Sequence, residues 1–275
     1  MPDIFNTTAK VLSNEQVVSG IFRLKLFCGA IASACRPGQF VHIQCGEGRD
    51  FILRRPFSIH RKDGGGAFEV LFQVVGKGTK ALSNVRPRET LSLVGPIGNG
   101  FEIDDSMRNI ILVSGGIGIA PLIFLADELL SGKKRLCVLL GASSIGKLLY
   151  SIDLKRLVRK LYIATDDGTS GYKGPVVDLL PQAIDEFKPE KIYACGPEAM
   201  LKRVTEVSKD HSVPTEVCLE RLMGCGVGAC LSCVRKVKQN GKEVLARVCV
   251  DGPVFDAKEV IWQNSDDFGG VTPHT

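Results

Sequence analysis

The sequence predicts a β + α/β protein in three parts: an antiparallel β-barrel, a doubly wound parallel-sheet domain and a short cysteine-rich module. Short segments of alternating polarity, separated by Gly and Pro, fill residues 1–103. Apolar runs then alternate with helical stretches over residues 104–215, which is typical of an α/β layer. Residues 216–275 are rich in Gly and Cys and too few for a large core of their own. We therefore expect boundaries near residues 103 and 215.

The first part holds the strands of the predicted barrel. Apolar and polar side chains alternate in these segments with the period of a half-buried strand. The Gly-rich stretch 63–66 indicates a hairpin turn, and 95–100 indicates the turn that closes the last strand. We expect the strands at residues 20–27, 39–44, 57–61, 67–75 and 89–94.

The second part alternates buried strands with helices. Its strands are almost continuously apolar, as expected when both faces of a parallel sheet are covered. We expect these strands at residues 109–114, 135–140, 161–165 and 191–195. We expect helices at residues 121–130, 154–160 and 198–208, with a further helix beginning over 176–180 after a proline.

Composition and charge exclude several classes of protein. The chain has 275 residues, is 44% hydrophobic and carries a net charge of +5, which is ordinary for a folded protein and gives no sign of nucleic-acid or membrane binding. The longest uncharged run, 109–126, contains three glycines and a proline, so we do not expect it to span a membrane. Residues 1–10 lack the pattern of a secretory signal. We expect a cytoplasmic protein whose cysteines form no disulfides.

Four of the ten cysteines form a ligand pattern. Cys225, Cys230 and Cys233 have C-x4-C-x2-C spacing, and fifteen residues separate Cys233 from Cys249. The opening spacing is the plant-type pattern of a 2Fe–2S cluster, and the glycines between the cysteines permit a tight loop. We expect Cys249 to come from a strand over 247–250. Structural zinc and an inert buried cluster are the alternatives, but zinc sites use paired C-x2-C modules or histidine.

Two glycine-containing turns predict a nucleotide site. The turn 114–121 (S-G-G-I-G-I-A-P) lies between a buried strand and a helix, where backbone N–H groups can approach a pyrophosphate. The turn 195–197 (C-G-P) ends a later strand at the same edge of the sheet, with space for a flat ring. Tight turns without a ligand are the alternative at both places.

Two motifs in the barrel suggest a second ligand. Residues 54–58 (R-R-P-F-S) offer arginine for a phosphate and a serine hydroxyl for the edge of a flavin. Residues 76–79 (G-K-G-T) offer backbone N–H groups and a hydroxyl for another phosphate contact. Either motif alone is equally consistent with a basic surface pair or a hairpin turn.

Together these motifs resemble the ferredoxin–NADP reductase superfamily, whose members hold a flavin in a barrel and a nicotinamide cofactor in an α/β domain. Three further motifs make the resemblance more specific: 165–168 (T-D-D-G), 171–174 (G-Y-K-G) and 220–233 (E-R-L-M-G-C-G-V-G-A-C-L-S-C). Over essentially its full length, the chain is similar to the electron-transfer subunits of type B dihydroorotate dehydrogenase. The resemblance implies an FAD-binding barrel (1–103), an NAD-binding domain (104–215) and a 2Fe–2S module (216–275).

The resemblance also assigns residues by position. The implied FAD residues are Arg55, Pro56, Phe57, Ser58, Leu71, Phe72, Gln73, Gly78 and Thr79. The implied NAD residues are Gly115, Gly116, Gly118, Pro121, Cys195 and Gly196. The implied cluster ligands are Cys225, Cys230, Cys233 and Cys249. No acid–base catalytic residue is implied, and the histidines are dispersed along the sequence at His42, His60, His211 and His274.

The family's function implies a partner that carries FMN and oxidises dihydroorotate in pyrimidine (UMP) biosynthesis. Electrons would pass from that FMN to the 2Fe–2S cluster, to FAD and to NAD+, within a heterotetramer of two copies of each subunit. The loop 141–150 contains Lys147 but no arginine, which favours NAD over NADP. The alternatives are a sister subunit of an NAD(P)H-linked ferredoxin, sulfide or sulfite oxidoreductase, and a non-redox binding module stapled by zinc.

Overall fold

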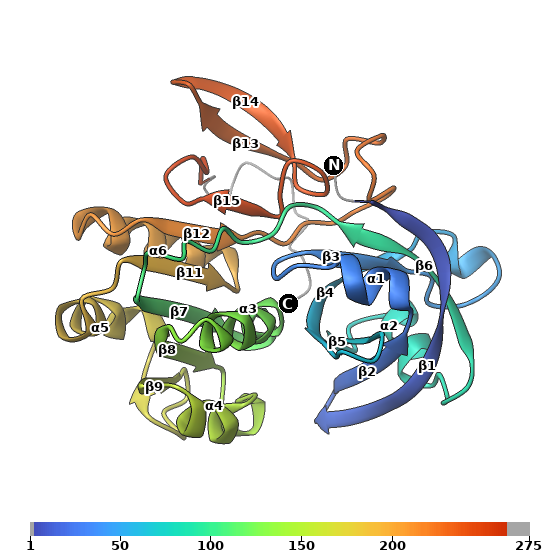
Figure 1. Cartoon of the computed structure of the whole chain (residues 1–275), viewed down its shortest axis with the longest axis horizontal. Coiled ribbons are helices and arrows are strands. Elements are labelled where there is room, and N and C mark those ends of the chain that lie inside the picture. The colour runs from blue at the N-terminus through green and yellow to red at the C-terminus, as the bar shows by residue number, and fades with distance from the viewer. Residues whose placement is uncertain (1–2, 263–275) are drawn as a thin grey trace.

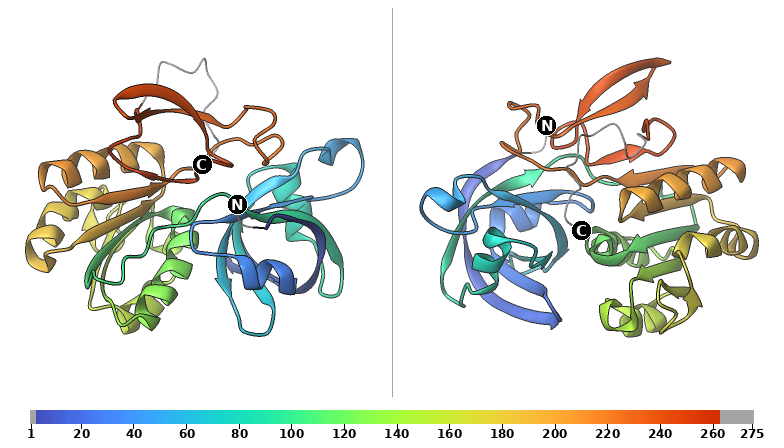
Figure 2. Two further views of the ribbon diagram at one scale, coloured as in Figure 1. Left: turned by 45° about the horizontal axis from the view of Figure 1, so that its top comes forward. Right: turned by 180° about the vertical axis from the view of Figure 1, so that it is seen from behind.

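The structure, a computed structural model, describes residues 3–262 and shows three parts (Figure 1). A closed barrel and a parallel sheet lie side by side, and the C-terminal segment lies across both of them (Figure 2). The predicted fold class is therefore confirmed. His274 and the last part of the predicted cluster module lie outside the described residues.

Six antiparallel strands close the barrel in the order β1-β2-β5-β4-β3-β6. These strands are β1 (Phe5–Val18), β2 (Ile21–Phe27), β3 (Phe40–Ile43), β4 (Arg55–Lys62), β5 (Ala67–Gln73) and β6 (Thr90–Ile97). The connections between them carry α1 (Gly29–Ala34), α2 (Lys77–Ser83) and the 3-10 turn η1 (Arg49–Phe51). All five predicted barrel strands are present, although their ends differ by a few residues.

Two features of the barrel differ from the prediction. The long strand β1 was not predicted, because its fully buried apolar side chains, Ala9 and Val11, stand among polar residues. The turn was expected to begin at Gly95, but β6 continues to Ile97. Gly95 still pairs with Phe5 of β1, and Ile97 still pairs with Phe40 of β3. Long-range pairing, which the local pattern does not contain, extends both strands.

A seven-stranded sheet forms the second part, in the order β10-β9-β8-β7-β11-β12-β15. The strands are β7 (Asn109–Gly115), β8 (Arg135–Ala142), β9 (Lys160–Thr165), β10 (Tyr172–Lys173), β11 (Lys191–Cys195), β12 (Thr215–Cys218) and β15 (Val254–Asp256). Neighbouring strands are parallel except for β15, which runs antiparallel to β12. The short strands β10, β12 and β15 were not predicted.

Helices cover both faces of this sheet, as the prediction of a doubly wound layer requires. One face packs against α3 (Ile119–Ser131) and α4 (Ser151–Leu157), and the other against α5 (Leu180–Phe187) and α6 (Glu198–Asp210). Three 3-10 turns complete the connections: η2 (Gly116–Gly118), η3 (Ile145–Lys147) and η4 (Val176–Leu179). Within residues 3–262, no helix has the length and apolar character needed to cross a membrane.

Two helix predictions need correction. The helix expected at 154–160 is α4, which ends at Leu157, because Lys160 already pairs with Cys137 of β8 as the start of β9. The helix expected to begin over 176–180 starts as the 3-10 turn η4, in which the Asp178 N–H donates to the Pro175 carbonyl at 3.0 Å. The α-helical hydrogen bonding begins only in α5.

The C-terminal segment is built into the core of the sheet domain. It contains a hairpin of β13 (Val234–Gln239) and β14 (Lys242–Arg247) and then supplies β15 to the sheet. Its Cys233 and Cys249 side chains belong to the same apolar core as residues of β7 and α5. The strand β12 (Thr215–Cys218) directly precedes this segment, so the segment leaves from the sheet itself.

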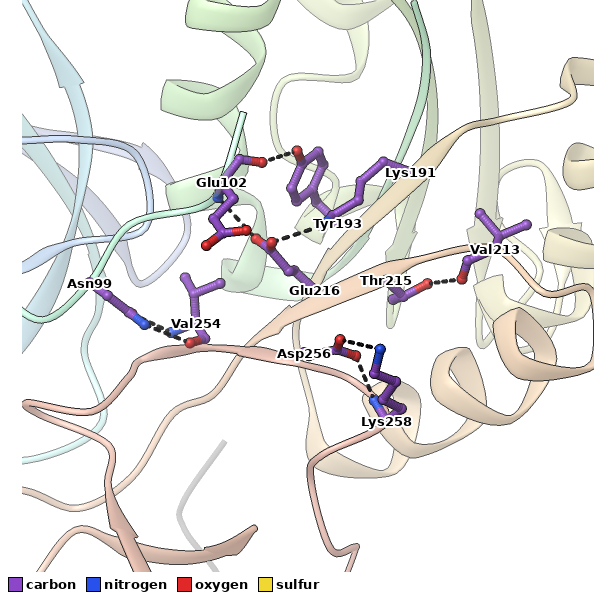
Figure 3. Close-up of polar contacts among 10 residues, drawn as sticks. All are labelled: Asn99, Glu102, Lys191, Tyr193, Val213, Thr215, Glu216, Val254, Asp256 and Lys258. Atoms are coloured by element: carbon purple, nitrogen blue, oxygen red, sulfur yellow. Dashed lines mark hydrogen bonds and ion pairs between the residues drawn. The ribbon is translucent and has the colours of Figure 1, made fainter. Parts of the chain in front are cut away.

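A buried ion pair joins the interdomain connection to the sheet (Figure 3). The Lys191 ammonium of β11 lies 2.8 Å from a carboxylate oxygen of Glu216 on β12, and both side chains are nearly buried. The other oxygen of Glu216 accepts the Glu102 backbone N–H at 3.1 Å, and the Tyr193 hydroxyl donates to the Glu102 carbonyl. Because Glu102 lies between barrel and sheet, these contacts fix the place where the two domains join.

We expect Glu216→Ala to lower the free energy of unfolding by about 3–5 kcal/mol, because it leaves the Lys191 charge buried without its partner. Chemical denaturation measures the change. Lys258→Ala is the matched control, since Lys258 pairs with Asp256 at 3.0 Å in an exposed position nearby (Figure 3). Loss of that exposed pair should cost less than about 1 kcal/mol. Equal losses in the two variants would contradict the role given to Glu216.

Candidate functional site

The two glycine turns predicted to hold a nucleotide meet at the carboxyl edge of the sheet. β7 and β11 are parallel neighbours, with Ser114 opposite Cys195. A Cβ on Gly118 would lie 2.4 Å from the Cys195 carbonyl oxygen, and a Cβ on Gly196 would lie 3.0 Å from the Gly115 nitrogen. Both distances are too short for a side chain, so the close approach of the two turns requires glycine.

The same turns leave polar groups available to a ligand. The Ser114 hydroxyl is buried and has no hydrogen-bond partner among residues 3–262. No side chain caps the first turn of α3, which contains the predicted Pro121. Gly116 has a φ of +54° and open space where a Cβ would stand. Uncapped N–H groups at a helix start, next to an unpaired hydroxyl, fit a nucleotide phosphate.

Cys195 sits in this site as a neutral thiol. Contact with the Cys218 thiol, burial and the charge of Glu220 raise the pKa of Cys195 well above its ordinary value. A thiol of this kind is a poor nucleophile, so its contribution is its small size beside the glycine turn. Glu220 belongs to the motif 220–233, but no local signal in the sequence marks it as a neighbour of Cys195.

The barrel brings two predicted phosphate residues together. A Cβ on Gly78 would lie 3.7 Å from the Arg55 Nε, so the arginine side chain passes directly over the start of α2. Arg54 was not among the predicted site residues, yet one of its guanidinium nitrogens is buried with no hydrogen-bond partner among residues 3–262. Its other terminal nitrogen donates to the Ser92 hydroxyl at 2.9 Å. An orphaned guanidinium N–H fits an anionic ligand.

The Thr79 hydroxyl is used within its own turn. It accepts the N–H groups of Val75 at 2.9 Å and Gly76 at 3.1 Å, and it donates to the Gly76 carbonyl at 3.1 Å. The hydroxyl therefore closes the turn that leads into α2. What the turn presents outward is its backbone and Gly78, beside Arg55.

The remaining predicted flavin residues divide between the two faces of the barrel wall. Phe57 and Phe72 belong to the barrel core, where their rings pack edge to face at 5.7 Å. Because side chains alternate along a strand, their neighbours Pro56, Ser58, Leu71 and Gln73 stand on the outer face. A flavin on that face would meet these four side chains and only the backbone of the two phenylalanines.

The four predicted cluster ligands lie in two close pairs. The Cys230 N–H donates to the Cys225 sulfur at 3.3 Å, and the Cys225 N–H donates to the Cys230 sulfur at 3.4 Å. The Cys233 and Cys249 thiols contact each other, and burial together with this contact raises the pKa of Cys249 to about 12. A 2Fe–2S cluster takes four thiolates on two irons, and two pairs of sulfurs fit this demand.

Backbone amides surround the outer pair. The Cys225 sulfur also accepts N–H groups from Val227 at 3.4 Å and Ala229 at 3.2 Å. The Ser232 hydroxyl lies 3.1 Å from the Cys230 sulfur and lowers the pKa of that thiol to about 6. Such donors favour the thiolate form that binds iron. Within residues 3–262, no three His, Cys, Asp or Glu side chains are arranged around the position of one metal ion.

The prediction that Cys249 comes from a strand is wrong. β14 ends at Arg247, and Cys249 lies in the turn that follows. The Arg247 carbonyl accepts the N–H groups of both Val250 and Asp251, at 3.0 Å and 2.7 Å. This reversal returns the chain toward the sheet and buries Cys249 beside Cys233.

One of the histidines that are dispersed along the sequence lies against the cysteine loop. His42 on β3 is 1% exposed, and a Cβ on Gly226 would lie 2.5 Å from its Nδ1. Burial, assisted by the charge of Arg54, lowers the pKa of His42 to about 4. A single histidine in a short apolar strand carries no sequence signal for a contact 184 positions away.

A cavity elsewhere in the molecule takes no part in this site. It has a volume of about 490 Å³ and lies between α1 and α3. Its lining includes Ser33, Lys62, Phe124 and Glu128, and none of the predicted site residues. The predicted residues instead lie in the wall of the barrel and the turn at α2, at the edge of the sheet, and in the cysteine loop.

Comparison with known proteins finds relatives along nearly the whole chain. Residues 220–261 match the family described as the iron–sulfur cluster binding domain of dihydroorotate dehydrogenase B, and residues 112–206 match the oxidoreductase NAD-binding domain. A relative from Desulforamulus reducens, named dihydroorotate dehydrogenase B (NAD(+)), electron transfer subunit, is 41% identical over 93% of this chain and 98% of its own. A relative of the same name from Fusobacterium nucleatum is 36% identical over 91% and 96%.

Solved structures agree with this fold. The structure of an NADH-dependent reduced ferredoxin-NADP oxidoreductase matches 94% of this chain and 91% of its own, with a TM-score of 0.82 and 30% identity. A ferredoxin reductase in carbazole 1,9a-dioxygenase covers 77% of this chain and 67% of its own, with a TM-score of 0.65 and 22% identity. The second similarity shows the fold alone.

We expect Gly118→Ala to lower the free energy of unfolding by about 3 kcal/mol, because its Cβ would collide with the Cys195 carbonyl. Gly116→Ala is the matched control, since its Cβ would meet no atom within 4 Å. The positive φ of Gly116 should cost that variant only about 1 kcal/mol. Denaturation of both variants checks the difference, and equal stabilities would show that the two turns are not held in contact.

Proposed function

Because the chain belongs to the family of dihydroorotate dehydrogenase B electron-transfer subunits, we propose that it passes electrons from a partner's FMN to NAD+ in pyrimidine biosynthesis. It is an oxidoreductase component with an NAD-binding domain and an iron–sulfur domain. The observation that carries the proposal is the arrangement of the cysteine loop. The loop lies against the barrel strand β3, while the nucleotide turns lie at the facing edge of the sheet.

The cofactors supply the redox chemistry: a nicotinamide exchanges a hydride, an iron–sulfur cluster exchanges single electrons, and a flavin exchanges either. The chain's own residues bind and orient these groups. Cys225, Cys230, Cys233 and Cys249 hold the cluster in two pairs. Arg55 and the turn at Gly78 bind the FAD pyrophosphate, and Ser58 faces the flavin from the outer wall of the barrel. The remaining proposed flavin contacts are Pro56, Leu71 and Gln73, with backbone contacts at Phe57, Phe72 and Thr79.

The nucleotide site orients NAD through shape. Gly115, Gly118 and Gly196 let the two turns approach each other, and the neutral Cys195 thiol leaves room for the nicotinamide ring. In the loop 141–150 the Lys147 ammonium donates to the Ser19 carbonyl at 2.8 Å, which commits it to the barrel and supports NAD over NADP. This chain supplies no acid or base for orotate formation, which belongs to the partner.

The partner docks beside the cysteine loop in this proposal. Leu222, Val227 and Leu231 are between 48% and 66% exposed around the ligand Cys230, which is itself exposed. Three exposed apolar side chains within ten residues of one another support the use of this segment as a protein interface. We further propose an assembly of two such chains with two FMN-carrying partners, located in the cytoplasm.

A sister function is the second candidate. The ferredoxin-NADP oxidoreductase structure shares 30% identity with this chain and nearly its whole length, which supports a partner other than the dihydroorotate enzyme. The dihydroorotate relatives are more similar, at 34–41% identity. The match of residues 220–261 to an iron–sulfur domain also leaves no support for a zinc-stapled binding module.

The deciding experiment is an anaerobic assay of dihydroorotate-dependent NAD+ reduction. It combines this chain, loaded with FAD and cluster, with an FMN-type dihydroorotate dehydrogenase subunit from the same source. We expect NADH to appear only when both chains are present. If the chain oxidises NADH with an artificial acceptor but never couples to dihydroorotate, the sister function replaces the one proposed.

We expect Cys230→Ser to abolish electron flow between this chain and its partner while NADH still bleaches the flavin, because the substitution removes one thiolate from the exposed cluster pair. Stopped-flow absorbance follows both reactions in the same sample. Cys28→Ser is the control, since Cys28 is the N-cap of the short helix α1 and serine is favoured there. An unimpaired partner reaction in Cys230→Ser would remove the cluster from the route.

A further inference from the structure

His42 stands on the same outer face of the barrel as the proposed flavin contacts. β3 and β4 run antiparallel, with Phe40 opposite Ser58. Opposed residues in an antiparallel pair share a face, and so do alternate residues along one strand. His42 therefore stands on the face of Ser58, whereas Val41 and Phe57 point into the barrel core.

The other side of the His42 ring touches the cysteine loop. A Cβ on Gly226 would lie 2.5 Å from Nδ1 and 3.0 Å from Cε1 of the ring. Gly226 directly follows the ligand Cys225 and has a φ of +71°, so both backbone conformation and space demand glycine there. The ring thus fills the space between the flavin face of the barrel and the first cluster ligand.

The two nitrogens of this ring make no well-formed hydrogen bond among the described residues. Both Nδ1 and Nε2 are buried, and neither makes a hydrogen bond of normal geometry within residues 3–262, although the Cys225 and Arg54 backbones lie close enough to act on the pKa of the ring. An unpaired buried polar group costs about 1–3 kcal/mol, so an apolar ring would serve packing better at this position. By contrast, His60 on the same face uses both nitrogens, toward the Ala120 carbonyl at 3.0 Å and the Tyr150 hydroxyl at 2.8 Å. The unpaired nitrogens of His42 point to a ligand-dependent role.

We propose that His42 is a positioning residue between cluster and flavin: it holds the cysteine loop at the barrel face and donates a ring N–H to the sulfur of the loaded cluster. The inference rests on the proposed function, because it assumes that both groups are bound. For each electron passed, the cluster is oxidised by one electron and the flavin is reduced by one. His42 itself is neither oxidised nor reduced, and it keeps its proton.

The chemistry of the site favours this role over simple packing. Hydrogen bonds to the sulfurs and exclusion of solvent are the means by which a protein sets the potential of an iron–sulfur cluster. The backbone N–H groups of Val227, Ala229 and Cys230 already donate hydrogen bonds to the Cys225 sulfur from within the loop. His42 is the donor that comes from the flavin barrel, so it alone among these donors links cluster potential to the position of the barrel.

Two substitutions separate donation from packing. His42→Phe keeps an aromatic ring but has no N–H, whereas His42→Asn keeps a donor near the position of Nδ1. Each is prepared as the full chain with FAD and cluster, beside wild type and His211→Phe. His211 is exposed at the C-terminal end of α6 and serves as the histidine-to-phenylalanine control.

The readouts are the midpoint potential of the cluster, its electron paramagnetic resonance spectrum, and the rates at which NADH reduces first the flavin and then the cluster. We expect His42→Phe to lower the potential and to slow flavin–cluster transfer by at least about tenfold, as is usual for loss of an outer-shell partner. Flavin reduction by NADH should stay unchanged. His42→Asn should recover most of the potential and of the transfer rate.

The proposal is overturned if His42→Phe keeps the wild-type potential and transfer rate, or if His42→Asn is as impaired as His42→Phe. If a variant loses its cluster, the iron content is the readout. Loss of iron in His42→Phe alone supports the proposal, and equal loss of iron in His42→Phe and His42→Asn overturns it. These measurements need no partner and no dihydroorotate. If the chain transfers electrons between flavin and cluster but fails the dihydroorotate-coupled assay, the proposed partner is refuted and the role of His42 is unaffected.

Discussion

The alternation of side chains along β3 and β4 decides how the three parts of the molecule meet. One face of these strands turns inward and closes the barrel core with Val41 and Phe57. The other face turns outward, where Phe40 joins the apolar core that contains Cys233 and Cys249. Further along this face His60 reaches the Ala120 carbonyl of α3. Because side chains alternate with a period of two, a register shift of one residue between β3 and β4 would point these outward side chains into the barrel.

This constraint explains why the sequence predicts the parts better than their assembly. The apolar runs of β7 and β11 are local, and the turns that follow them need glycine for local reasons, so both were predicted from the chain itself. Cys225, Cys230 and Cys233 are equally local, because the spacing of ligands within one loop reflects the geometry of one group. Patterns within a few residues of each other are the ones that a single sequence displays.

What the sequence did not show depends on pairing between distant residues. β1 is a strand because it pairs with both β2 and β6, although its own side chains are mostly polar. β15 is three residues long and exists because β12 offers it an edge. Cys249 was placed on a strand from its neighbours, yet the hydrogen bonds of the Arg247 carbonyl reverse the chain before it. The contact between His42 and Gly226 joins two local patterns that each look ordinary alone.

The way the cysteine loop is anchored has a consequence for the assembly of the cluster. The segment 219–253 leaves the sheet at the end of β12 and returns to the neighbouring strand β15, so both of its ends are held in adjacent strands. The Asn99 side chain donates to the Val254 carbonyl at 2.9 Å and accepts its N–H at 3.0 Å (Figure 3), which fixes the returning end to the interdomain connection. Since the ends are already close, folding of the sheet has met the entropic cost of closing the loop before any metal binds. The free energy of metal binding is then available to order the ligands themselves and to press the loop against His42.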